Sequence, residues 1–188
     1  MSDSLPFATP SDWRAWLLAN HASAPELTLK LFKKASGTPS LTWEEAVIEA
    51  LAFGWIDSTK RPGGPDHWFQ RFSPRKPRSG WSQKNRAHVE KLIAEGRMTP
   101  AGLVHVEAAK ADGRWDAAYS GGAGAEVPQD FLDALARNAD AANTYNTLNA
   151  QNRYAIYYRL TTAKRPETRA KRVAAFVDML ARGERLHP

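Results

Sequence analysis

Asp57 is the residue whose sequence surroundings best fit acid–base chemistry. It follows two apolar residues, Trp55 and Ile56, and two cations, Lys60 and Arg61, come shortly after it. Burial raises the pKa of a carboxyl group and a nearby cation lowers it, so this position can hold a carboxyl group with a shifted pKa. Asp57 is therefore a weak candidate for a catalytic acid or base. A structural carboxylate that holds an arginine or caps a turn is the favoured alternative.

Positive charge is concentrated between residues 60 and 86. This segment holds eight basic residues and one acidic residue, a net charge of +7, in a chain of 188 residues whose total charge is +6. Guanidinium groups offer forked donors to phosphates and carboxylates, so we expect an anion-binding face here. A solvated surface without a ligand is the alternative. The candidate residues are the donors Arg61, Arg71, Arg75, Lys76 and Arg86, with Trp81 as an apolar wall.

Aromatic residues interleave with these charges, which is typical of nucleic-acid binding. Trp68 and Trp81 lie within the basic segment, and single-stranded nucleic acids stack their bases on aromatic side chains while cations neutralise the phosphates. Packing in the core is the alternative for both tryptophans. From the residues we expect a binding protein first, a nucleic-acid-binding protein second, and an enzyme acting on a small anionic substrate third. The expected partner is an anionic ligand, either a small phosphate or a nucleic acid.

Other kinds of chemistry are excluded by composition and by missing motifs. The chain has no cysteine, which excludes disulfides, thiol catalysis and thiolate metal sites. No two of its five histidines have the spacing that would present two metal ligands on one helix face, so no metal is expected. No nucleotide-binding or hydrolase motif occurs, and no cofactor is expected.

The sequence also bears on location. A membrane-spanning helix needs about 20 predominantly apolar residues, and no stretch of this length occurs. The chain begins Met1-Ser2-Asp3-Ser4, with an acidic residue where a secretory signal carries positive charge. We therefore expect a cytoplasmic protein without membrane insertion. The oligomeric state is left open.

Apolar patterns predict an α+β fold with a small, mainly antiparallel sheet covered by helices. Residues 27–33 alternate apolar and polar side chains, as a half-buried strand does. Residues 55–60 and 67–72 are expected to form a hairpin. The loop of residues 73–80 contains two prolines and a glycine, so we expect Arg75 and Lys76 to be exposed there.

Helix starts are marked by N-cap residues. Candidate caps at Thr9, Thr42, Ser82 and Thr99 each precede an apolar helical pattern. The second of these forms a capping box with Glu45, and the expected buried face of its helix begins at Trp43.

A glycine-rich segment divides the chain. We expect residues 120–127 to link an α+β lobe of residues 1–119 to a helical lobe of residues 128–188. About 60 residues of helix have a small core, so we expect the second lobe to pack on the first.

Several strings together resemble one protein family. They are Leu51-Ala52-Phe53-Gly54-Trp55-Ile56-Asp57-Ser58, Gln70-Arg71-Phe72-Ser73-Pro74-Arg75-Lys76, Ser79-Gly80-Trp81-Ser82, Gly96-Arg97-Met98-Thr99-Pro100 and Ala163-Lys164-Arg165-Pro166-Glu167. Their order is similar to that of the YdeI/OmpD-associated family, also described as bacteriocin-protection proteins, over roughly residues 13 to 180. The resemblance implies a protective association, and it brings no reaction, cofactor or catalytic residue with it.

Overall fold

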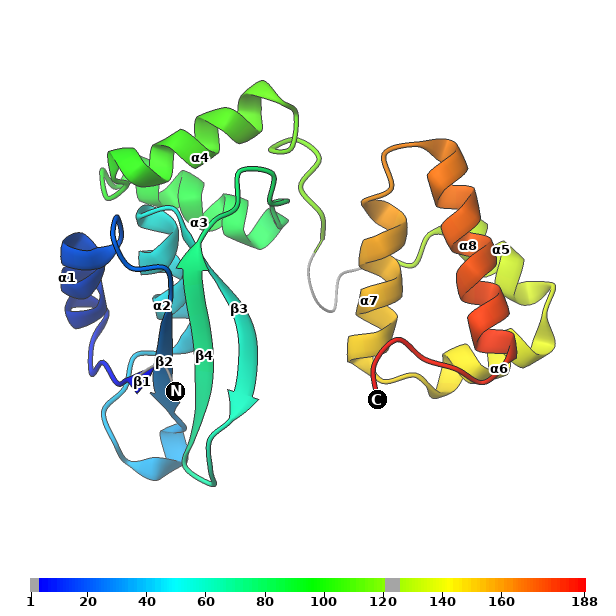
Figure 1. Ribbon diagram of the computed structural model, residues 1–188, viewed down its shortest axis with the longest axis horizontal. Helices are drawn as coiled ribbons and strands as arrows, with labels where there is room; N and C mark the ends of the chain where they lie inside the picture. The colour runs from blue at the N-terminus through cyan, green and yellow to red at the C-terminus, as the bar shows by residue number, and fades with distance from the viewer. Residues whose placement is uncertain (1–3, 121–125) are drawn as a thin grey trace. The chain divides into compact units, whose positions relative to one another are not determined.

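The computed structural model describes residues 4–120 and 126–188. The chain divides into two compact units, Met1–Ala118 and Tyr119–Pro188 (Figure 1). The first unit contains the sheet and the second contains helices, which confirms the predicted α+β fold with a helical C-terminal lobe. Most of the expected linker, residues 121–125, lies outside the described residues.

The sheet has four strands in the order β1-β2-β4-β3. The strands are β1 (Ser4–Leu5), β2 (Leu27–Phe32), β3 (Trp55–Pro62) and β4 (His67–Pro74). β1 runs parallel to β2, and the other pairs are antiparallel, as predicted. The short strand β1 was not predicted, because two residues are too few to show an alternating pattern.

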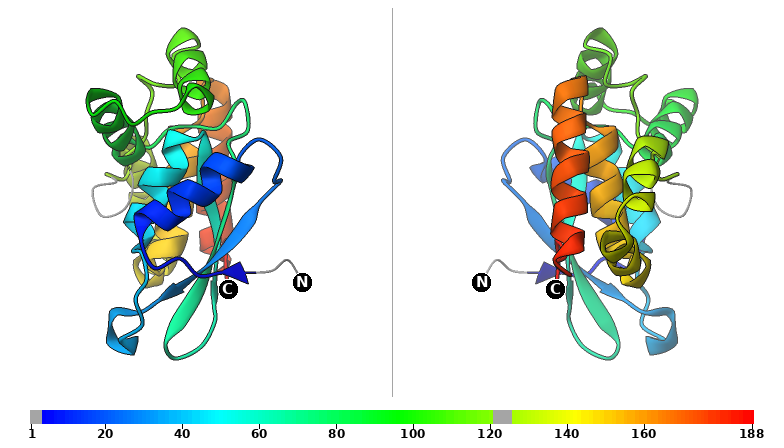
Figure 2. Two further views of the ribbon diagram at one scale, coloured as in Figure 1. Left: turned by 90° about the vertical axis from the view of Figure 1, so that its left-hand side faces the viewer. Right: turned by 90° about the vertical axis from the view of Figure 1, so that its right-hand side faces the viewer.

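One face of the sheet forms the core of the first unit, and α1 (Pro10–Asn20) and α2 (Trp43–Ala52) lie over it (Figure 2). Neighbouring residues in the register share this face: Leu27, Leu29 and Leu31 of β2, and Phe72, Gln70 and Trp68 of β4. Trp13 of α1 lies 5.6 Å from Phe72 between ring centroids. Its Nε1 donates to the Ala46 carbonyl at 3.0 Å, so one buried indole joins both helices to the sheet.

The helices begin where the sequence predicted. The first unit also contains the 3₁₀ helix η1 (Lys34–Ser36), α3 (Gln83–Ala94) and α4 (Pro100–Ala111). The four predicted caps each accept a hydrogen bond from the backbone N–H three residues later. One expectation was wrong: Trp43, placed in the buried face of α2, is 38% exposed. It is the first residue of the helix and lies beyond the stripe that meets the sheet.

In its described residues, the second unit has four helices around an apolar core of its own. They are α5 (Gln129–Ala136), α6 (Ala139–Thr147), α7 (Ala150–Thr161) and α8 (Pro166–Ala181). Phe131, Ile156, Leu160 and Leu180 are almost fully buried in this core. None of the helices in the described ranges is long and apolar enough to span a bilayer.

Gly54 makes the turn from α2 into β3. Its φ of +72° lies in the left-handed region, which side chains with a Cβ rarely adopt. An added Cβ would also meet the His105 ring at 2.6 Å and the Ala101 carbonyl oxygen at 2.9 Å. Both conformation and space therefore require glycine here.

Gly54→Ala should lower the free energy of unfolding by about 2–5 kcal/mol, from backbone strain and overpacking together. Gly96→Ala is the matched control, because Gly96 has a φ of +66° and open space around an added Cβ. It should lose only the strain part, about 1–2 kcal/mol. Urea unfolding followed by circular dichroism measures both losses. Equal losses would show that the contact with His105 and Ala101 has no effect.

Candidate functional site

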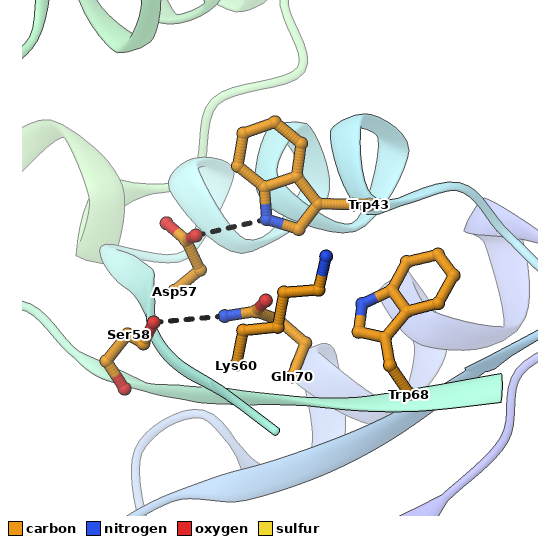
Figure 3. A pocket seen from close by; sticks show the side chains of 6 residues that line it. All are labelled: Trp43, Asp57, Ser58, Lys60, Trp68 and Gln70. Carbon is orange, nitrogen blue, oxygen red and sulfur yellow. Dashed lines mark hydrogen bonds between the residues drawn. The ribbon is translucent and has the colours of Figure 1, made fainter. Parts of the chain in front are cut away.

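A pocket of about 420 Å³ opens between the start of α2 and the β3–β4 hairpin (Figure 3). It lies on the helix-covered face of the sheet, at the end of that face where the core gives way to polar side chains. Its lining residues are Trp43, Asp57, Ser58, Lys60, Trp68 and Gln70.

A β-bulge brings two of the charged lining residues together. Asp57 pairs with Phe72 and Lys60 pairs with Gln70, so β3 has two residues between these pairs where β4 has one. Side chains alternate between faces along a regular strand, and residues three apart would point to opposite faces. The extra residue returns Lys60 to the face of Asp57. The pocket therefore contains both a carboxyl group and an ammonium group.

Asp57 anchors one wall of the pocket. The Trp43 Nε1 donates a hydrogen bond to Asp57 Oδ2 at 3.0 Å, which holds a half-exposed indole at the pocket rim. Burial raises the pKa of Asp57 above its ordinary value. The hydrogen bond from Trp43 and the positive charge of Arg75 offset this rise only in part. The carboxyl group thus takes up a proton more readily than an exposed aspartate does.

Lys60 and Trp68 form the opposite side. The Lys60 Nζ lies 5.2 Å from the centre of the Trp68 ring, and Figure 3 shows the Lys60 side chain extending between the two indole rings. Gln70 is buried, and its Nε2 donates to the Ser58 carbonyl at 3.2 Å. The result is a pair of aromatic walls with one cation between them. Such a site can contact a flat apolar group and bind an anionic substituent on it.

The predicted anion donors are distributed over several parts of the first unit. Arg61 and Arg71 lie on β3 and β4, on the sheet face opposite the pocket. Lys76 is exposed in the loop after β4, and Arg86 lies on α3. Among the predicted site residues, the structure places Asp57 in the lining of the pocket.

Arg75 and Trp81 correct the expectation of an exposed loop. Arg75 is 5% exposed and Trp81 is 2% exposed. The Arg75 Cζ lies 3.8 Å from the Trp81 ring centre. Arg75 Nη2 also donates to the Gly80 carbonyl at 2.7 Å. Pro74 ends β4, and Pro77 lies in the loop that follows. Stacking on Trp81 draws the guanidinium of Arg75 into the core, so Trp81 is a core residue rather than a surface wall.

Three cations of the basic segment form ion pairs with acids from outside it. Arg71 forms an ion pair with Glu26. Lys84 pairs with Glu44 at 2.8 Å, and Arg86 pairs with Glu90 at 3.1 Å. These ion pairs therefore offset part of the charge repulsion expected within the segment.

Trp43, Lys60, Trp68 and Gln70 were not predicted as site residues. The basic segment includes Lys60 and Trp68. In a regular strand the side chain of Lys60 would point to the other face of the sheet, and only the bulge brings it to the face of Trp68. In the parts of the chain that the structure describes, no three His, Asp or Glu side chains form a group that could hold a metal ion.

Two family models match the chain. Residues 5–105 match the family described as Domain of unknown function (DUF8412). Residues 124–183 match the family described as Bacteriocin-protection, YdeI or OmpD-Associated. The predicted resemblance to the latter family is confirmed over residues 124–183, whereas the strings between residues 51 and 100 fall within the other match. No curated protein and no solved structure matches the chain.

Asp57→Asn tests the burial of the carboxyl group through pH dependence. Because the pKa of Asp57 is raised in the folded protein, its ionisation favours the unfolded chain, and wild-type stability falls as pH rises through the folded pKa. Asparagine keeps an acceptor for Trp43 and cannot ionise. The variant should therefore gain stability relative to wild type between about pH 3 and pH 7.

Urea unfolding at several pH values measures this difference, and Asp116→Asn is the control because Asp116 is exposed. The control should show no comparable gain. A difference for Asp57→Asn that shrinks as pH rises would contradict the raised pKa.

Arg75→Ala should lower the free energy of unfolding by about 3 kcal/mol, because it removes a desolvated cation–π contact and a charged hydrogen bond. Lys76→Ala, next to it in the same loop, should change the free energy of unfolding by about 0.5 kcal/mol or less. Thermal unfolding of both variants measures the contrast. Similar small effects would restore the exposed-loop interpretation of Arg75.

Proposed function

We propose that this chain, which belongs to the family described as Domain of unknown function (DUF8412), is a binding protein. Its ligand is a small organic anion with a flat apolar part. The site is the pocket between α2 and the β3–β4 hairpin. The anionic group is a carboxylate or a phosphate.

The observation that carries this proposal is the position of Lys60 between Trp43 and Trp68. Two indole rings provide faces on which a flat group can stack. The Lys60 ammonium group lies beside these rings, where it can bind an anionic substituent of a stacked ligand. A pocket of about 420 Å³ falls within the range of small-molecule sites, about 300–1,000 Å³.

Electrostatics favour an anion over a cation. A cationic ligand would meet the Lys60 ammonium in the pocket. Asp57 is the one carboxyl group in the lining, and its Oδ2 already accepts a hydrogen bond from the Trp43 indole. The pocket is therefore better suited to negative charge.

A protective role is consistent with this binding. The family matched by residues 124–183 is described by bacteriocin protection, and sequestering a small molecule is one way for a cytoplasmic protein to protect a cell. Catalysis is the weaker alternative. Asp57 could donate or accept a proton, but the hydroxyl of Ser58 in the lining is hydrogen-bonded to Arg71. The lining also holds no second carboxyl group to complete an acid–base pair.

Isothermal titration with 1-naphthyl phosphate, indole-3-acetate, inorganic phosphate and neutral 1-naphthol tests the proposal. We expect saturable binding of the two aromatic anions, with much weaker binding of phosphate alone and of 1-naphthol. Lys60→Ala should weaken binding of the aromatic anions about tenfold or more, as loss of a charge-assisted hydrogen bond does. The Trp43 and Trp68 indole N–H resonances should shift on binding.

Lys76→Ala is the matched control, because Lys76 is an exposed lysine of the same basic segment that lies outside the pocket lining. It should bind the aromatic anions as wild type does. Equal losses in the two variants would assign binding to the general charge of the segment. No shift of either indole resonance would exclude the pocket as the site.

A further inference from the structure

The second face of the sheet carries a row of three aromatic rings. The Phe32 and His67 ring centroids are 5.8 Å apart, and those of His67 and Phe69 are 5.2 Å apart. Phe32 and Phe69 are partly exposed, and neither packs against the hydrophobic core of the first unit. The row therefore lies on the face opposite α1 and α2.

Cations flank this row because of the strand register. β4 lies between β2 and β3 (Figure 1). Phe69 pairs with Lys30 of β2 on one side and with Arg61 of β3 on the other. Residues directly opposite one another share a sheet face. An aromatic ring thus has a positively charged side chain on each side.

The charges of Lys30 and Arg61 are not taken up by ion pairs. Within residues 4–120 and 126–188, neither forms an ion pair with a carboxylate. Arg71, in the next row of this face, is instead paired with Glu26. The Lys30 Nζ lies 4.8 Å from the Phe32 ring centre. The Glu26 carboxylate acts on Arg61, and the Asp66 carboxylate on Lys30, by electrostatic attraction without an ion pair, so both cations remain able to meet an anion.

We propose that this sheet face, formed by Lys30, Phe32, Arg61, His67 and Phe69, binds single-stranded nucleic acid. Bases stack on aromatic rings that reach the protein surface, as the partly exposed Phe32 and Phe69 do, and cations beside the rings neutralise the phosphates that join the bases. This function is separate from that of the pocket, which lies on the other face of the sheet.

Geometry favours a single strand over other polyanions. Phe32 and Phe69 are diagonal neighbours on adjacent strands, a relation that puts residues about 7–8 Å apart, so each ring can take one of two successive bases. A duplex hides the faces of its bases. An acidic peptide would meet the cations and leave the rings without a stacking partner.

Fluorescence anisotropy of a labelled oligothymidylate, titrated with the full chain, tests this proposal. A length of about twelve nucleotides lies within the range of single-strand binding sites. We expect binding at low salt that weakens as salt rises. Phe69→Leu keeps an apolar side chain and removes the stacking surface. It should weaken binding roughly fivefold to hundredfold, the range found when stacking residues are replaced. Arg61→Ala should weaken binding and reduce the slope of log K against log salt by about 0.7.

Two control variants separate this surface from other sites. Lys76→Ala removes an exposed lysine elsewhere in the basic segment, and Trp43→Phe alters the pocket. Both should bind the oligonucleotide as wild type does. Circular dichroism checks that Phe69→Leu is folded, and Phe32→Leu repeats the test if it is not.

Three results would each overturn the proposal. The first is absence of binding at low salt. The second is unchanged binding by the folded Phe69→Leu or Phe32→Leu variant, which would exclude stacking. The third is equally tight binding of a duplex or of polyglutamate, which would show a general polyanion surface.

Discussion

One extra residue in β3 decides which side chains of the hairpin can act together. Before the bulge, Asp57 faces the helices, and after it Lys60 faces them too. The same shift sends Arg61 to the opposite face, next to Phe69. In a regular strand, Lys60 and Arg61 would exchange faces. The pocket would then lose its ammonium group, and Phe69 would have Lys60 in place of the guanidinium of Arg61.

Hydrogen bonds, stacking and ion pairs fix the backbone around the bulge, and the bulge can therefore position the side chains of β3. The Arg75 backbone N–H donates to the Gly54 carbonyl at 2.9 Å, so the end of β4 is tied to the start of β3. Stacking of Arg75 on Trp81 keeps the following loop against the core. Glu49, buried in α2, pairs with Arg14 and Arg97 and so joins α2 to α1 and to the segment before α4. These contacts fix the frame in which the carboxyl group of Asp57 and the indole of Trp43 meet.

Local features of the fold could be predicted from the sequence, and features set by tertiary contacts could not. The N-caps at Thr9 and Thr42 depend on residues three positions away, so their motifs are visible in the sequence. The pocket depends on a register shift, and no periodic pattern marks the residue at which it occurs. Arg75 was misplaced because prolines and charges indicate a loop but do not show that a guanidinium stacks on a tryptophan.

Net charge alone does not identify the cations available for binding. The segment of residues 60 to 86 carries +7, yet Arg71 and Arg86 in it hold carboxylates. In the described part of the chain, Lys60 and Arg61 form no such pair. Each lies instead beside an aromatic ring, Trp68 in the pocket and Phe69 on the opposite face. A cation next to a ring and without a carboxylate keeps its charge for a ligand, and the ring supplies apolar contact at the same place. The two adjacent residues after the bulge thus lie on opposite faces of the sheet, one at each of the two proposed binding surfaces.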